Sequence, residues 1–143
     1  MSYLVSTKGR YALRIMLDLS ENGQNEYIPL KGIAERQDIS LKYMETIMPG
    51  LVKAGLVTAV PGKSGGYKLS RPVRDYTVGE ILNVTEGELA PVACLASGYV
   101  CPRADTCRTL PLWQKMDSLI KNYLATVKLT DLLSDDGTNE YCI

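Results

Sequence analysis

Hydrophobic positions in the first half of the chain repeat at helical spacing in three consecutive segments. Residues 8–21 form the first predicted helix, which Asn22-Gly23 ends. Its apolar side carries Tyr11, Ala12, Ile15, Met16 and Leu19. Its other side carries the charged residues Lys8, Arg10, Arg14 and Asp18. Such a division predicts one side in a hydrophobic core and one side in water.

The next two predicted helices are short and close together. Residues 30–37 form the second, Asp38-Ile39 is a tight turn, and Ser40 is a suitable N-cap for a third that runs to about Ala54. Pro49 lies inside this third helix, where a proline removes a backbone donor and clashes with the preceding turn at a cost of about 3 kcal/mol. We therefore expect a kink near Glu45–Met48. Two helices joined by a short turn form a helix-turn-helix.

A β-hairpin is predicted directly after these helices. Gly55 ends the third helix, residues 56–60 form a short strand, and residues 67–69 form the returning strand. Between them, residues 61–66 read PGKSGG, which is typical of a turn. A hairpin in this place is a wing, so residues 1–76 are predicted to form a winged helix-turn-helix domain.

The second half, residues 77–143, contains a loop between predicted helices. Thr77 and Glu80 form a capping box for a helix to about Glu86. Residues 87–109 show no periodicity and hold three of the four cysteines. Periodicity returns over residues 111–128 and again over 130–134. The apolar face of the longer helix consists of Leu112, Trp113, Met116, Leu119, Ile120, Tyr123, Leu124 and Val127. The fold class is therefore mainly α with a small β-hairpin, plus a long dimerisation helix.

Composition and charge narrow the function. With 45% hydrophobic residues the chain has enough apolar material for a packed core. It shows no apolar run near the roughly 20 residues of a membrane-spanning helix and no signal-peptide stretch, so we expect a cytoplasmic protein without membrane contact. Residues 1–75 carry eleven Lys or Arg and seven Asp or Glu, whereas residues 76–143 carry five and nine. This asymmetry suggests a polyanion-binding module, although ordinary solvated faces also show charged runs.

The third predicted helix carries side chains that suit the DNA major groove. Ser40, Lys42 and Tyr43 could hold phosphates, Glu45 could accept from a cytosine amino group, and Thr46 suits either role. The wing offers further backbone contacts through Lys63, Ser64, Gly65 and Gly66. Phosphate contacts from the first helix would come from Lys8, Arg10 and Arg14. An ordinary amphipathic helix and hairpin share each feature singly, so it is their order that favours DNA binding.

The cysteines of residues 87–109 form a compact set. Cys94, Cys101 and Cys107 could bind a soft metal or an iron–sulfur cluster, with Arg103 and Arg108 lowering their thiol pKa values. Their spacing matches neither structural zinc sites nor ferredoxin-type sites, so three ordinary loop cysteines remain an alternative. The chain contains no histidine, so any fourth ligand is of another kind. Cys142 at the C-terminus is interpreted as an incidental tail residue.

Several segments resemble the Rrf2 (Rrf-two) family of bacterial transcription regulators. They are residues 6–13 (STKGRYAL), 33–36 (IAER), 39–45 (ISLKYME), 51–57 (LVKAGLV), 65–67 (GGY), 107–113 (CRTLPLW) and 129–132 (LTDL). The resemblance implies a winged-helix domain, a long helix that crosses to a partner subunit, and an iron–sulfur cluster on the three loop cysteines. It also assigns the DNA-reading glutamate to Glu45.

The chain departs from the family pattern at three places. Some members carry a histidine three residues after the last cysteine, where this chain has Leu110. Nitric-oxide-sensing members use an N-terminal aspartate, whose place Lys8 or Gly9 takes here. A wing arginine is replaced by Pro61. The fourth ligand, the cluster type (2Fe–2S or 4Fe–4S) and the DNA sequence preference are therefore open.

Three functions compete at this point. The leading hypothesis is a homodimeric repressor or other regulator that binds a pseudo-palindromic double-stranded operator and senses iron, redox state or nitric oxide through the cluster. The alternative is a cluster-free regulator controlled by a protein partner or by thiol oxidation. An enzyme is disfavoured, because the chain has no histidine, nucleophile elbow or phosphate loop.

Overall fold

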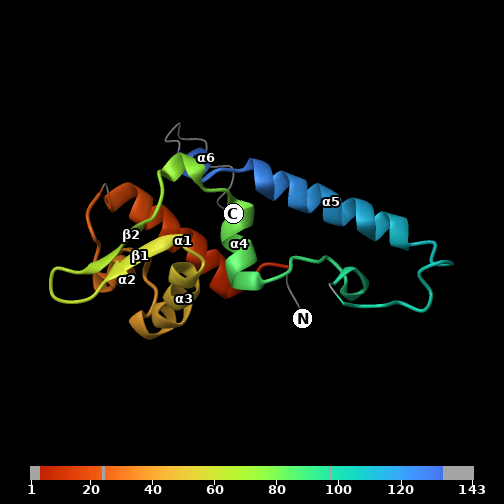
Figure 1. Ribbon diagram of the computed structural model, residues 1–143, viewed down its shortest axis with the longest axis horizontal. Coiled ribbons are helices and arrows are strands. Elements are labelled where there is room, and N and C mark those ends of the chain that lie inside the picture. The colour runs from red at the N-terminus through yellow and green to blue at the C-terminus, as the bar shows by residue number, and fades with distance from the viewer. Residues whose placement is uncertain (1–3, 24, 97, 134–143) are drawn as a thin grey trace.

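The computed structural model describes residues 4–23, 25–96 and 98–133. Figure 1 shows a helical body that holds a two-stranded hairpin, with one long helix extending away from it. The main elements are α1 (Thr7–Asn22), α2 (Leu30–Gln37), α3 (Leu41–Lys53), β1 (Val57–Val60), β2 (Gly66–Leu69), α4 (Val78–Glu86), α5 (Leu110–Thr126) and α6 (Leu129–Leu133). Short 3-10 helices, η1 (Val73–Asp75) and η2 (Ala93–Leu95), lie in the connections. The predicted fold class is confirmed, and the helix bounds differ from prediction by at most two residues.

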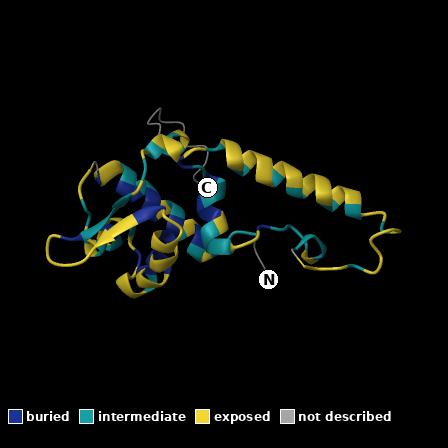
Figure 2. Cartoon of the chain, in the orientation of Figure 1, coloured by how far each residue is buried: buried dark blue, intermediate teal, exposed yellow. Residues whose placement is uncertain are grey.

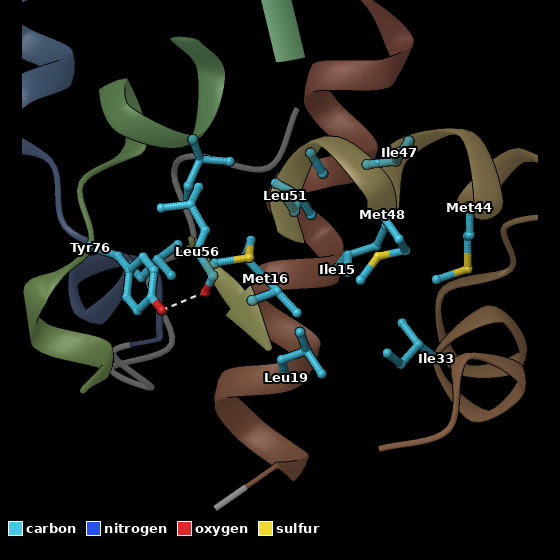
Figure 3. Close-up of a cluster of buried hydrophobic side chains, with 14 of the residues drawn as sticks. Ile15, Met16, Leu19, Ile33, Met44, Ile47, Met48, Leu51, Leu56 and Tyr76 are labelled. Atoms are coloured by element: carbon cyan, nitrogen blue, oxygen red, sulfur yellow. Dashed lines mark hydrogen bonds between the residues drawn. The ribbon is translucent and has the colours of Figure 1, made fainter. Parts of the chain in front are cut away.

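The core forms around α1. Figure 3 shows side chains of α1, α2 and α3 meeting with Leu56 and Tyr76 in one apolar cluster. Helices α2, α4 and α6 and strand β2 all contact α1. The completely buried side chains of this cluster include Ala12, Ile15, Met16, Ile33, Met44, Leu51, Tyr76, Ile81 and Leu129. Because these come from both halves of the chain, α4 and α6 are parts of the support for α1 and α3.

Helix α3 continues through Pro49 to Lys53. The sequence predicted a kink near Glu45–Met48, and the helix is assigned without a break across these residues. Pro49 and Glu45 both lie on its exposed side. Water can therefore reach the Glu45 carbonyl that the missing proline donor leaves without a helical partner.

The wing is anchored to the segment before α2. Strands β1 and β2 pair antiparallel, with Val57 opposite Leu69 and Val60 opposite Gly66. Tyr67 also exchanges backbone hydrogen bonds with Ile28, at 2.8 and 2.9 Å. Strand β2 thereby gains a second neighbour near the turn, which fixes the direction of the hairpin relative to the helix-turn-helix.

Tyr76 connects the wing to the end of α5. Its ring is completely buried, and its hydroxyl donates to the carbonyl of Leu56 at 2.6 Å. Its own carbonyl accepts from Leu129 N at 3.2 Å, and Val78 N donates to the carbonyl of Val127 at 2.8 Å. This pairing returns the chain after α5 to the core, where Leu129 packs. No helix within the described ranges is both long and apolar enough to cross a bilayer.

One charged residue lies on the opposite side from the one predicted. Asp18 was expected on the solvated side of α1, but it is only 1% exposed. It follows Ile15 by three positions and so lies on the same buried face. Its carboxylate accepts from Arg36 Nε at 2.9 Å, from Arg36 Nη2 at 2.7 Å and from Gln37 Nε2 at 3.0 Å. Asp18 raises the pKa of the Arg36 guanidinium through these hydrogen bonds, and the pair fixes α2 against α1.

We predict that the two halves of this ion pair have unequal effects on stability. Arg36→Ala leaves a buried carboxylate with only the Gln37 amide and should lower the free energy of unfolding by about 3 kcal/mol. Asp18→Asn should cost only about 1–2 kcal/mol, because the Arg36 side chain is 41% exposed and regains water. Urea unfolding measures both. Lys31→Ala, on the exposed side of α2, is the control. A larger loss in Asp18→Asn than in Arg36→Ala would contradict this account.

Candidate nucleic-acid interface and cysteine loop

The outward side of α3 carries most of the predicted DNA contacts. Ser40 caps the helix, because its hydroxyl accepts from Tyr43 N at 3.1 Å. Lys42, Glu45 and Thr46 are exposed. The Thr46 hydroxyl donates back to the carbonyl of Tyr43 at 2.6 Å, so its hydrogen serves the helix while its lone pairs face outward. The first two turns of α3 thus present one cation, one carboxylate and hydroxyl acceptors.

Tyr43 and Arg14 hold α1 beside the start of α3. The Tyr43 ring is half-buried and meets the Tyr11 ring edge-on, with centroids 5.5 Å apart. The Arg14 guanidinium lies 5.4 Å from the centroid of Tyr11 and donates to the carbonyl and side-chain oxygens of Gln37. The sequence assigned phosphate contacts to Arg14 and Tyr43. The contacts that the structure gives them are internal ones, which brace the turn between α2 and α3.

The start of α1 lies next to this brace. Arg10 is exposed, and its Nη2 donates to Thr7 Oγ1 at 3.1 Å. Lys8 is half-buried. Both belong to the first turn of α1, and Tyr11 directly after them contacts α3. The residue that follows them thus connects this turn to α3.

The wing tip exposes Lys63 and Ser64, while the two glycines after them have a packing role. A side chain on Gly66, which has a φ of +149°, would collide with the carbonyl of Ile28. One on Gly65 would collide with the carbonyls of Val60 and Pro61. Close backbone approach explains both glycines without DNA, so any DNA contact there would come from their backbone.

The basic charge of the first half is partly neutralised inside the fold. Arg36 pairs with Asp18, and Arg71 Nη2 donates to Glu80 Oε1 at 2.7 Å. The hydrogen bond from Arg71 to Glu80 raises the pKa of the guanidinium. Thr77 caps α4 by accepting from Glu80 N at 3.2 Å, which is one half of the predicted capping box. The Glu80 carboxylate binds Arg71, so it fastens α4 to the end of the wing.

The cysteine loop runs from Gly87 to Thr109 along the side of α5 (Figure 1). Cys94, Cys101 and Cys107 are all half-exposed free thiols. Within the part of the chain that the structure describes, they do not form a group of three or more His, Cys, Asp or Glu that could hold a metal ion. Cys142 lies outside the described residues.

Cys107 has a distinct environment at the end of this loop. Its Sγ lies 3.4 Å from Thr109 Oγ1. The hydroxyl and backbone N–H of Thr109 lower the pKa of the Cys107 thiol, and the charge of Arg103 adds to this effect. Thiolate is the form that binds metals and reacts with oxidants, so a lowered pKa favours both metal binding and oxidation at this thiol.

Helix α5 exposes an apolar stripe. Leu112, Leu119 and Tyr123 are 55–56% exposed and Met116 is 38% exposed, although all four are large hydrophobic residues. Figure 2 shows α5 as almost wholly exposed. The other apolar residues of the helix, Trp113, Ile120 and Leu124, lie on a second face that is half-buried against this same chain. One face of α5 therefore has an intramolecular neighbour and one face has none among the described residues.

Comparison with known proteins identifies the family. Residues 5–135 match the Rrf2 family model, described as an iron-dependent transcriptional regulator. Protein rrf2 of Nitratidesulfovibrio vulgaris is 36% identical over 131 residues, covering 92% of this chain and 87% of that protein. The structure of CymR, the global cysteine regulator of B. subtilis, is similar with a TM-score of 0.73 and 34% identity, covering 92% of this chain and 96% of that chain. The structure of T. potens IscR gives 0.72 and 37%, with coverages of 90% and 85%.

These relatives are regulators rather than enzymes, and their similarity extends over the helix-turn-helix, the wing and α5. Together with the exposed polar side of α3 they establish what the chain is. It belongs to the Rrf2 family of DNA-binding transcription regulators.

Proposed function

We propose that this regulator acts as a homodimer on a pseudo-palindromic operator and holds an iron–sulfur cluster on its cysteine loop. The observation that carries the proposal is that one chain exposes two surfaces suited to binding. The exposed polar side of α3 fits a major groove, and the apolar stripe of α5 fits a second copy. A two-fold dimer would present two α3 helices, which matches two half-sites.

On DNA, each exposed side chain has a separate task. Lys42 neutralises a phosphate, and Glu45 accepts a hydrogen bond from the amino group of a cytosine in the major groove. The wing tip at Lys63 and the first turn of α1 at Arg10 reach the backbone on either side. Arg14 keeps α1 and the helix-turn-helix together, so that these contacts can form at once.

We predict that Lys42→Ala and Glu45→Ala change DNA binding in different ways. Lys42→Ala should weaken binding to all sequences alike and lower the dependence of affinity on salt by the equivalent of about one phosphate. Glu45→Ala should relax the preference at one base pair in each half-site. Fluorescence anisotropy with an operator and its single-base variants measures both. Lys53→Ala, at the far end of α3, is the charge-matched control. An unaltered base preference in Glu45→Ala would refute the base-reading role.

We infer the homodimer from the apolar stripe of α5, which no other part of the described chain covers. The stripe of Leu112, Met116, Leu119 and Tyr123 is continuous on one side of a 17-residue helix. Soluble monomers rarely leave such a stripe in water. We expect a second molecule to cover this exposed stripe, and a second α5 offers the matching apolar surface.

We predict that charges within this stripe abolish the dimer. Leu119→Glu combined with Tyr123→Glu should give monomers or insoluble protein, because buried unpaired carboxylates oppose association. Analytical ultracentrifugation distinguishes these outcomes. Ser118→Glu adds a charge on the opposite side of α5 and should leave the dimer intact. Unchanged dimers in the double variant would rule out this interface.

The donor chemistry of the loop fits an iron–sulfur cluster. Three thiols on one loop supply three of the four protein ligands that such clusters usually have, and the environment of Cys107 favours its thiolate. The described residues do not bring the three thiols together, so binding would require the loop to close. Since the chain has no histidine and position 110 is leucine, an oxygen donor or an exogenous ligand would complete the site.

We predict that iron binding depends on the three loop cysteines alone. After anaerobic reconstitution, Cys94→Ala, Cys101→Ala and Cys107→Ala should each lose most of their iron and sulfide, because two thiolates are too few to retain a cluster. Cys142→Ala should keep both and is the matched control. Iron and sulfide analysis with an absorption spectrum measures the result. Equal loss in Cys142→Ala would make that residue the fourth ligand and disprove this assignment.

A cluster-free regulator remains the second candidate. It is favoured by the separation of the three free thiols and by the lowered pKa of Cys107. This chain is also similar to CymR, the global cysteine regulator of B. subtilis. Control would then come from thiol oxidation or from a protein partner on the loop. A colourless, iron-free protein after anaerobic reconstitution would favour it.

A further inference from the structure

The first turn of α1 is fastened to the last residue of α4. Glu86 Oε1 accepts from Ser6 N at 3.0 Å and from Ser6 Oγ at 2.6 Å. The two residues are 80 positions apart in the chain. Both are half-buried, and hydrogen bonds to a carboxylate are stronger than bonds between neutral groups. We call this pair the Ser6–Glu86 clamp.

The clamp acts on the cap of α1. The Ser6 hydroxyl accepts from Gly9 N at 3.3 Å while it donates to Glu86, so one oxygen connects the helix start to α4. Gly9 is buried, and a side chain there would collide with the Glu86 carboxylate. The helices can approach this closely because position 9 has no side chain. The negative charge also stabilises the positive end of the α1 dipole.

The clamp lies beside the turn of α1 that carries the proposed phosphate contacts. Lys8 and Arg10 lie in the turn that Ser6 begins, and the proposed function places both at DNA phosphates. On the other side, Glu86 ends α4, and the cysteine loop starts at Gly87. The clamp therefore joins the phosphate-binding turn to the base of the loop.

We propose that Glu86 is a positioning residue for DNA binding, which holds the first turn of α1 where Lys8 and Arg10 reach the phosphate backbone. This inference rests on the proposed contacts of α1 with DNA. Glu86 itself carries the wrong charge to touch a phosphate. Its loss leaves the Ser6 cap and the packing of Leu82 under Gly9 in place, so α1 stays helical while its first turn loses its fixed position.

The test compares Glu86→Ala and Glu86→Gln, which remove the same charge. Operator binding is measured by fluorescence anisotropy over a range of salt concentrations. Removing a negative charge near DNA should by itself strengthen binding. We expect Glu86→Ala instead to weaken binding about tenfold, the size of one charge-assisted hydrogen bond. Its salt slope should fall by about 0.9 for each phosphate that is no longer neutralised. Glu86→Gln keeps Oε1 as an acceptor and should retain the wild-type slope.

Further variants separate loss of the clamp from unfolding and from general effects of substitution. Thr85→Ala removes only a local bond to the carbonyl of Leu82, at 3.2 Å, and should bind DNA like the wild type. Glu86→Asp keeps the charge but withdraws the carboxylate from Ser6, so its salt slope should fall as that of Glu86→Ala does, and it replaces Glu86→Ala if that variant unfolds. Adding Arg10→Ala should weaken the wild type but change Glu86→Ala little.

The outcomes separate this inference from the function on which it rests. A wild-type protein without salt-dependent DNA binding would overturn the proposed function. A wild-type protein that binds DNA, with an unchanged salt slope in Glu86→Ala and Glu86→Asp, would overturn the positioning role alone. Glu86→Gln binding as weakly as Glu86→Ala would also overturn it, because the acceptor oxygen is then not what matters.

Discussion

The burial of α1 is the constraint on which the rest of the structure depends. This helix contacts α2, α4, α6 and β2, so few of its positions can face water. Where a neighbour approaches most closely, α1 has Gly9 or Ala12. Where it carries a charge inward, at Asp18, a guanidinium from α2 neutralises it. Helix α3 in turn packs on α2 and α4, two of these neighbours, and on β1.

Segments from both halves of the chain support the helix-turn-helix and the wing. The wing is tied to Ile28 on one side and to Tyr76 on the other. Tyr76 in turn pairs with the segment that brings Leu129 back into the core. The end of α5 is therefore linked to the wing by a few backbone hydrogen bonds and one buried ring.

Local sequence signals predicted the elements well, because their causes are local. Ser40 and Thr77 cap their helices as expected, and the apolar spacing of α1 and α3 matches their buried faces. Exposure of Lys42 and Glu45 followed from the same periodicity. The side on which Asp18 lies was predicted wrongly, because its burial depends on how α2 crosses α1. A polar residue three positions after a buried isoleucine was the available signal.

The interactions that the sequence could not reveal join distant segments. Arg14 reads as a surface cation until the turn after α2 is placed beside it. The Gly65-Gly66 pair reads as flexible, whereas the approach of Ile28 and of the carbonyls around Val60 requires it. The Ser6–Glu86 clamp joins residues 80 positions apart and leaves no local pattern. Pairings of this kind depend on packing angles, which composition and periodicity do not contain.

The two halves of the chain differ in how completely they bury their apolar side chains and pair their polar groups. The helix-turn-helix and wing leave Leu41, Val52 and Val60 exposed but bury most of their other large apolar side chains, and their buried carboxylate has a partner. The loop and α5 instead keep a continuous exposed apolar stripe and three free thiols. A second copy would cover the apolar stripe, and a soft metal would bind the thiols.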